Sequence, residues 1–168
     1  MKKIILSAIM LIGVAYTAQA QDISKNALGL SLGGNNGFGG ELSYQRGLSK
    51  NNRLELDLGW RNRSNYDNNV YDDNAIKLAA LYQWVWNIDG GFNWYAGVGG
   101  GAGNYSYDVK NDKRYSDTFV FAAGDIGLEY NFDFPLLISL DFRPEFGGNG
   151  YYKNNYGSDI ALGLRFQF

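Results

Sequence analysis

The sequence predicts an all-β fold, an eight-stranded antiparallel up-and-down transmembrane β-barrel. Segments of about ten residues alternate apolar with small or charged side chains, and turn-rich stretches separate eight such segments. Because successive side chains on a strand point to opposite faces, each segment has one apolar face and one small or polar face. The chain holds only 2 prolines, as expected where most residues donate to a hydrogen-bond ladder.

Residues 1–20 have the pattern of a secretory signal peptide, which leaves a single barrel domain over residues 21–168. Lys2 and Lys3 precede an apolar stretch, and small residues around Ala20 form a cleavage site. Loss of the two lysines takes the formal net charge from −2 to −4, which argues against nucleic-acid binding. The absence of cysteine excludes disulfides and thiol chemistry.

The first four strands are predicted at residues 26–34, 38–46, 53–62 and 75–86. Their apolar faces carry Leu28, Leu30 and Leu32; Leu54, Leu56, Leu58 and Trp60; and Ile76, Leu78, Ala80, Tyr82, Trp84 and Trp86. Their opposite faces are small or polar, with Gly29, Ser31 and Gly33; Glu41, Ser43 and Gln45; Glu55, Asp57, Gly59 and Arg61; and Lys77, Ala79 and Gln83.

The last four strands are predicted at residues 92–103, 119–132, 136–146 and 158–168. The last two have clear apolar faces, formed by Ile138, Leu140, Phe142 and Phe146, and by Leu162, Leu164, Phe166 and Phe168. The opposite faces of all four carry Gly97, Gly99, Gly101 and Gly103; Asp125, Gly127 and Glu129; Ser139, Asp141, Arg143 and Glu145; and Arg165.

The composition of the small or polar face indicates which face of each strand points inward. It is mostly Gly, Ala and Ser with sparse charges, which suits the crowded interior of a narrow barrel, so the apolar face is expected to contact lipid. Aromatic residues near the strand ends are then interpreted as two interfacial girdles. These are Tyr44, Trp60, Trp84, Trp86, Phe92, Trp94, Tyr130, Phe132, Phe134, Phe142, Phe146, Phe166 and Phe168.

The predicted connections alternate in length. Residues 47–52, 87–91 and 133–135 form short turns, whereas 63–74, 104–118 and 147–157 are long, and 35–37 is a short member of the second set. With both termini periplasmic, the long set faces the outside of the cell.

With these features the chain resembles the small eight-stranded outer-membrane barrels of the OmpA/OmpX type, over about residues 26–168. The resemblance implies a location in the outer membrane of a Gram-negative cell, among outer-membrane lipid and lipopolysaccharide. It also implies that the barrel-assembly machinery reads the last strand, through Leu162, Leu164, Phe166 and Phe168. No loop matches a particular member, so the resemblance implies no ligand.

We expect no catalytic residue, cofactor or metal. Barrel-type acyltransferases, deacylases and proteases of the outer membrane use a histidine as base, and this chain has 0 histidines. Neither of two acidic runs has calcium-loop spacing; they are Asp67, Asp72 and Asp73, and Asp108, Asp112 and Asp117.

A network of charges is predicted inside the barrel. One interpretation is a salt-bridged plug that closes and rigidifies the barrel. The other is a narrow, acid-lined, cation-preferring pore, with space provided by glycines on strand 92–103 and by small residues on strands 26–34 and 158–168. Glu129, Arg143 and Arg165 are expected to form a hydrogen-bonded chain. The full predicted network is Glu41, Glu55, Asp57, Arg61, Lys77, Asp125, Glu129, Asp141, Arg143, Glu145 and Arg165.

The long connections are rich in tyrosine and asparagine, a mixture typical of binding loops. Solvated polar loops and an upper aromatic girdle would explain the same pattern. The candidate binding residues are Tyr66, Tyr71, Tyr105, Tyr107, Tyr115, Tyr151, Tyr152 and Tyr156. A small basic cluster, Lys110, Lys113 and Arg114, is a weaker candidate for lipopolysaccharide phosphates.

The leading hypothesis is therefore a non-enzymatic outer-membrane barrel with a structural or surface-binding role, whose loops contact a surface protein or glycan. The alternatives are a narrow pore for ions or small solutes and an accessory subunit of an outer-membrane complex.

Overall fold

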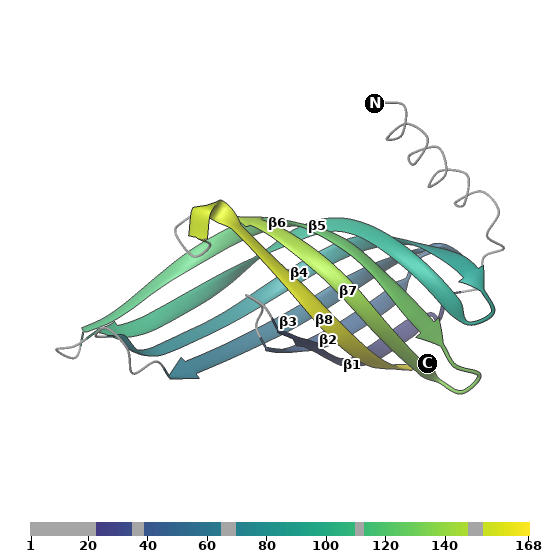
Figure 1. Cartoon of the computed structure of the whole chain (residues 1–168), viewed down its shortest axis with the longest axis horizontal. Helices are drawn as coiled ribbons and strands as arrows, with labels where there is room; N and C mark the ends of the chain where they lie inside the picture. The colour runs from purple at the N-terminus through teal and green to yellow at the C-terminus, as the bar shows by residue number, and fades with distance from the viewer. Residues whose placement is uncertain (1–22, 35–38, 65–69, 110–112, 148–152) are drawn as a thin grey trace, which may run out of the picture.

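A computed structural model describes residues 23–34, 39–64, 70–109, 113–147 and 153–168. It is a closed barrel in which each strand pairs antiparallel with the next, in chain order (Figure 1). The strands are β1 (Asn26–Gly33), β2 (Gly40–Gly47), β3 (Asn52–Ser64), β4 (Val70–Asp89), β5 (Phe92–Val109), β6 (Lys113–Asn131), β7 (Leu136–Gly147) and β8 (Tyr156–Gln167). The predicted fold class is confirmed, whereas the predicted signal peptide lies outside the described residues.

Pairing of the first and last strands closes the barrel. β1 pairs with β8 as well as with β2, for example at Leu30 opposite Leu164. At the seam, the amide of Asn26 donates to the carbonyl of Phe168 at 3.0 Å, and the amide of Phe168 donates back at 2.9 Å. We call this end, which also holds the short turns, the terminal end. Among the described residues, no helix is long and apolar enough to cross a membrane.

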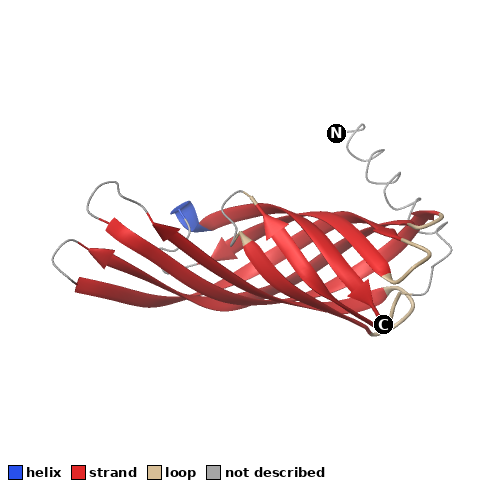
Figure 2. Ribbon diagram, turned by 90° about the horizontal axis from the view of Figure 1, so that it is seen from below, coloured by secondary structure: helices blue, strands red, loops and turns tan. Residues whose placement is uncertain are grey.

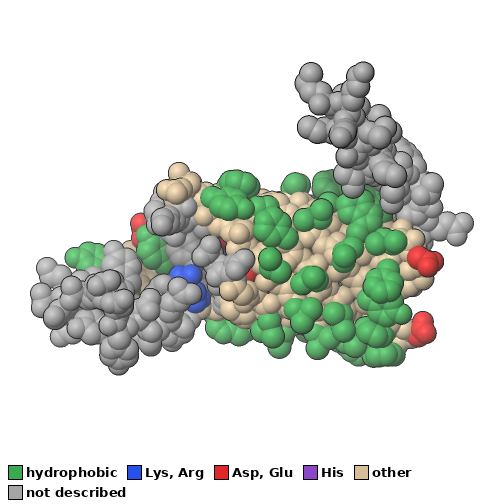
Figure 3. Space-filling view, in the orientation of Figure 1, with side chains coloured by type: hydrophobic (Ala, Val, Ile, Leu, Met, Phe, Trp, Pro, Cys, Tyr) green, Lys and Arg blue, Asp and Glu red, His purple; other side chains and the backbone are tan. Residues whose placement is uncertain are grey.

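The two faces of the wall follow the predicted alternation. Outward side chains are apolar and exposed, such as Leu164 at 52% and Ile126 at 51%, and they cover the face of the wall seen in Figure 3. Inward charged side chains are buried, such as Glu55 at 1% and Arg165 at 1%. Apolar residues outside and charged residues inside are the reverse of a water-soluble barrel, and this arrangement suits a lipid surrounding.

The strands at the other end are longer than predicted. β4, β5 and β6 have 20, 18 and 19 residues, whereas about 9–11 tilted residues suffice to span a bilayer. The predicted loops 63–74 and 104–118 were therefore wrong in extent, because much of each is strand; Tyr105, for example, pairs with Asp117. Beyond a membrane both faces of a sheet contact water, so these segments need no apolar face and their sequence resembles a loop.

The extra length forms a sheet that protrudes from the barrel. β6 pairs with β7 from Phe121, opposite Gly147, toward the terminal end of the barrel. Its earlier stretch, from Lys113 to Val120, pairs with β5 alone. β3 to β6 accordingly run past the end of β7, as Figures 1 and 2 show. A short 3-10 turn, η1 (Lys153–Asn155), precedes β8 beside this step. We call the part of β3 to β6 beyond the step the protruding sheet.

Candidate functional site

Arg143 is the centre of the lumen network. It extends from β7 across the barrel and is 3% exposed. Its Nη1 lies 3.1 Å from Glu41, and its Nη2 lies 2.8 Å from Asp57 and 3.7 Å from Glu55. One guanidinium thus compensates carboxylates of β2 and β3, on the opposite wall.

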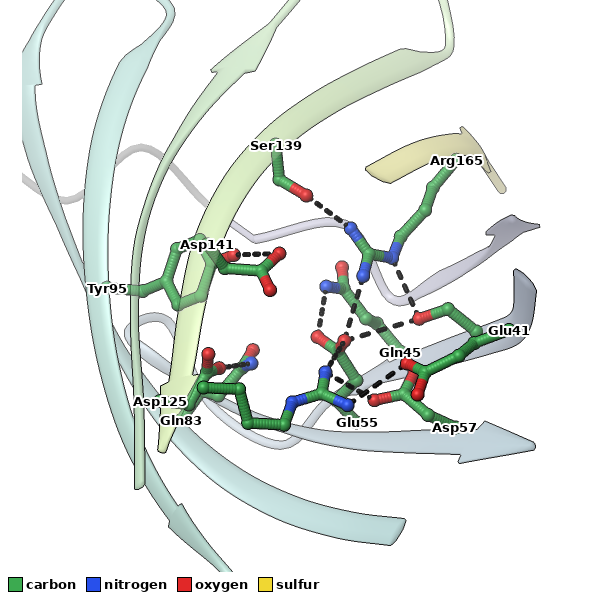
Figure 4. Close-up of polar contacts among 12 residues, drawn as sticks. Glu41, Gln45, Glu55, Asp57, Gln83, Tyr95, Asp125, Ser139, Asp141 and Arg165 are labelled. Carbon is green, nitrogen blue, oxygen red and sulfur yellow. Dashed lines mark hydrogen bonds and ion pairs between the residues drawn. The ribbon is translucent and has the colours of Figure 1, made fainter. Parts of the chain in front are cut away.

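Arg165 binds the same wall from the last strand. Its Nη2 donates to Glu55 at 2.8 Å, its Nε to the Ser43 hydroxyl at 2.9 Å, and its Nη1 to the Ser139 hydroxyl at 2.7 Å (Figure 4). Gln45 adds a hydrogen bond to the second oxygen of Glu55 at 2.6 Å. β8, β2, β3 and β7 are therefore joined inside the barrel as well as through their backbones.

Lys77 links the network to the part of the lumen nearest the protruding sheet. Its Nζ lies 2.7 Å from Glu145 and 3.4 Å from Glu41. The same Nζ is 5.6 Å from the centre of the Phe121 ring. Arg61, the remaining predicted base, is half-buried on β3.

Arg53 belongs to the network although sequence reasoning left it out. It is 1% exposed, binds Glu129 at 2.7 Å and Gln83 at 2.6 Å, and lies 4.7 Å from the centre of the Tyr95 ring. Its parity matches Glu55 on the same strand, which was the available signal. Because Glu129 pairs with Arg53, the predicted chain from Glu129 through Arg143 to Arg165 was wrong.

Two buried acids have only a neutral donor each. Gln83 donates to Asp125, and the Tyr95 hydroxyl donates to Asp141 at 3.2 Å. Asp125 is 5% exposed and Asp141 is 4% exposed, and in the described residues neither has an ion-pair partner.

Apolar side chains fill the lumen toward the protruding sheet. Tyr105 of β5 packs against their cluster, which comprises Ala75, Ala79, Leu81, Phe119, Phe121 and Ala123. Two glycines of β5 make room for its rings: an added Cβ on Gly101 would lie 2.7 Å from the Phe121 ring, and one on Gly103 would overlap the Phe119 ring at its Cζ. The expectation that the β5 glycines provide open pore space was therefore wrong at Gly101 and Gly103, because aromatic rings occupy the space beside them.

The predicted loop tyrosines fall into three groups. Tyr66, Tyr151 and Tyr152 lie outside the described residues. Tyr71, Tyr105, Tyr107 and Tyr115 lie in strands of the protruding sheet, and Tyr156 begins β8. Of these, Tyr115 is 48% exposed and Tyr156 is 45% exposed, with its ring centre 5.2 Å from that of Phe146.

Polar side chains are exposed on both faces of the protruding sheet at β5 and β6. On one face Asn104 connects two of them: its amide donates to the Thr118 hydroxyl at 3.4 Å, and the Ser116 hydroxyl donates to its oxygen at 3.0 Å. Tyr115 and Asp117 have the opposite parity on β6 and are exposed on the other face. We call these five residues, which occupy the two faces of the same strand pair, the β5–β6 patch.

The described residues hold no group of three His, Cys, Asp or Glu side chains that could bind a metal ion. At the terminal end, the predicted assembly residues Leu162, Leu164, Phe166 and Phe168 point outward and are 52–62% exposed.

Solved structures of outer-membrane barrels are similar to this one. The Yersinia pestis attachment invasion locus protein Ail matches with a TM-score of 0.57 and 16% identity, over 86% of this chain and 97% of that one. Neisserial surface protein A matches with a TM-score of 0.63 and 13% identity, over 85% of this chain and 94% of that one. The N-terminal barrel of Pseudomonas aeruginosa OprF matches with a TM-score of 0.62 and 19% identity, over 87% of this chain and 100% of that one.

The chain has the fold of the small eight-stranded outer-membrane barrels. No protein-family model matches it, and no curated protein matches its sequence. The likeness to solved structures covers most of the chain, so the barrel resemblance inferred from the alternating strands is confirmed. At these low sequence identities, the structural similarity supports a shared fold and nothing about a shared function.

Proposed function

We propose that this protein is a non-enzymatic barrel of the outer membrane that binds a surface partner through its protruding sheet. The single observation that supports this most is the β5–β6 patch, which exposes polar and aromatic side chains on strands beyond the barrel. Two proteins with similar structures have names that concern attachment, invasion or the cell surface, which agrees with this role.

The patch suits a protein partner. Tyrosine contributes rigid, amphipathic contact area, while Asn, Ser and Thr contribute adaptable hydrogen bonds. Because paired strands hold these side chains, less conformational entropy is lost on binding than for the same residues in a free loop. The binding surface proposed from the sequence thus moves from loops to strands.

The lumen supports the pore alternative less well. Arg143, Arg165 and Lys77 connect opposite walls, and Phe119 and Phe121 occupy the part above them. An ion would have to displace both layers, so we expect a closed barrel.

Replacing Tyr115 with alanine should weaken partner binding at least tenfold, because buried interface tyrosines commonly contribute more than about 1.4 kcal/mol. The refolded barrel in nanodiscs would be applied to a protein array and to a glycan array that includes heparin, with bound protein quantified at each spot. Tyr156→Ala is the matched control, since that tyrosine is similarly exposed, at 45% against 48% for Tyr115, but lies outside the patch.

Loss of protein spots with Tyr115→Ala but not with Tyr156→Ala would support the proposal. Ail has been crystallised with the heparin analogue sucrose octasulfate, so capture by heparin alone would reassign the partner to a sulfated glycan. Equal binding by all three proteins would contradict a role for the patch.

Assembly at the terminal end gives a second prediction. Phe168→Ala should slow insertion by the barrel-assembly machinery, because Phe168 is 62% exposed at the end of the last strand, where that machinery reads the chain in similar barrels. Phe134→Ala is the control, as Phe134 is 57% exposed in a turn at the same end. Insertion would be followed as the heat-modifiable band on gels; equal rates for both variants would contradict a special role for Phe168.

A further inference from the structure

A groove opens on the outer face of the wall at the step where β7 ends. It has a volume of about 840 Å³ and lies between β6, the end of β7 and the start of β8. Ala122 of β6 pairs with Phe146 of β7, which pairs in turn with Tyr156 of β8, so these three residues follow one another across the wall. Val120, at 58% exposed, and Phe146, at 56%, share the outward face. The groove is therefore continuous with the apolar surface that contacts lipid.

The groove lies where the outward face changes from apolar to polar. Away from the terminal end, the outward residues of β6 change from Val120 to Thr118 and Ser116. β8, which begins at Tyr156 and runs to the terminal end, has 12 residues, close to the roughly 9–11 that span a bilayer. Tyrosine is enriched at membrane–water interfaces, and the ring centre of Tyr156 lies 5.2 Å from that of Phe146. The groove thus extends from the hydrocarbon region into the headgroup region.

The polar side of the groove is uncharged. Asn154 and Asn155 of η1 line it together with Tyr156, and all three are exposed. The described residues that line the groove carry no charge. Amides and a phenolic hydroxyl donate and accept hydrogen bonds, which suits the hydroxyl and amide groups of a sugar, whereas a phosphate group is matched best by arginine or lysine. A ligand with a sugar next to its hydrocarbon chain fits this lining.

We propose that the groove binds lipopolysaccharide of the outer leaflet, with one acyl chain in its apolar part and the attached sugar beside Asn154 and Asn155. The acyl chains of a lipopolysaccharide are joined directly to sugar rings through ester and amide groups, whereas in a phospholipid a charged phosphodiester follows them closely. The volume of the groove lies in the range of about 300–1,000 Å³ found for small-molecule sites. This inference rests on the outer-membrane location in the proposed function but not on the β5–β6 patch.

The test uses lipid A as the probe. The full refolded barrel is placed in phosphatidylcholine nanodiscs that contain equal small fractions of lipid A and phosphatidylglycerol, and native mass spectrometry identifies the lipid that the released protein retains. The unaltered protein should retain lipid A preferentially. Ala122→Trp should reduce that retention at least tenfold, because the indole would occupy the groove. Ala80→Trp is the matched control: Ala80 is an exposed, outward alanine on β4, away from the groove, so its variant should retain lipid A in full.

A second variant tests the sugar contacts and covers the case in which Ala122→Trp does not fold. Asn154→Gly/Asn155→Gly removes both amides, and glycine readily adopts the left-handed backbone of these positions, whose φ angles are 58° and 59°. This variant should lower the retention of lipid A severalfold and leave that of phosphatidylglycerol unchanged.

Equal retention of lipid A by Ala122→Trp and Ala80→Trp, or by the double glycine variant and the unaltered protein, would overturn the proposal. So would retention of phosphatidylglycerol as strong as that of lipid A, because the groove would then accept any acyl chain. Tyr115→Ala should retain lipid A normally, so this test and the partner-binding test of the β5–β6 patch can fail separately.

Discussion

Replacing Arg143 with methionine should lower the free energy of unfolding by about 3–5 kcal/mol, because removal of one partner leaves buried charges uncompensated. Glu41, Asp57 and Glu55 all lie within 3.7 Å of its guanidinium, and each is at most 3% exposed. Methionine keeps much of the apolar stem, so the loss reports the charge rather than a cavity. Urea unfolding in detergent micelles, followed by tryptophan fluorescence, would measure it.

The matching control restores neutrality. In the background of Arg143→Met, the changes Glu41→Gln and Asp57→Asn should recover much of the lost stability, since buried ion pairs are often replaceable by neutral groups. A single Arg143→Met variant as stable as the unaltered protein would show that water already screens these carboxylates and would contradict a closely packed network.

Replacing Gly103 with valine should prevent efficient folding. An added Cβ there would overlap the Phe119 ring at its Cζ and would lie 2.6 Å from the carbonyl oxygen of Ile76. Overpacking of a filled core costs about 1–3 kcal/mol even when side chains can shift, and a backbone carbonyl cannot shift cheaply. The folded fraction, measured by heat modifiability after refolding, should fall severalfold.

Two further variants separate this clash from a general loss of glycine. Gly40→Val should fold normally, because the nearest atom to its added Cβ would be in the Trp60 side chain at 3.6 Å. Phe119→Ala combined with Gly103→Val should recover part of the folding, leaving only the clash with the Ile76 carbonyl. Normal folding of Gly103→Val alone would show that aromatic rings do not fill the lumen near the protruding sheet as described.

Alternation of apolar and small side chains was sufficient to predict the barrel, because a strand between lipid and a narrow lumen must present different chemistry on each face. The alternation pattern failed to predict the strands of the protruding sheet, where neither face contacts lipid. The segment from Asn104 to Thr118 has polar residues on both parities, so its pairing across β5 and β6 could not be recognised from an apolar face.

The composition of the lumen was predictable, but its pairing was not. Parity alone places Glu55 and Arg165 inside the barrel. Which base meets which acid depends on the register between strands, and the sequence alone does not specify that register. Arg53 illustrates the limit: it begins the predicted strand 53–62 with the same parity as Glu55, yet it was not assigned to the lumen network. Parity likewise placed the β5 glycines inside, without revealing the rings of β6 that fill the space beside them.

The long sequence separations within the lumen network have a kinetic consequence. Arg143 meets Glu41 across 102 residues, and Arg165 meets Ser43 across 122. These contacts cannot form until the last strand joins the first, so a partly inserted chain gains none of their stabilisation, and slow folding is expected of such non-local pairing. Once the seam is closed, spreading it also pulls guanidinium groups away from their acids. Opening and charge separation then occur in one step, which gives the finished barrel a long lifetime against spontaneous unfolding.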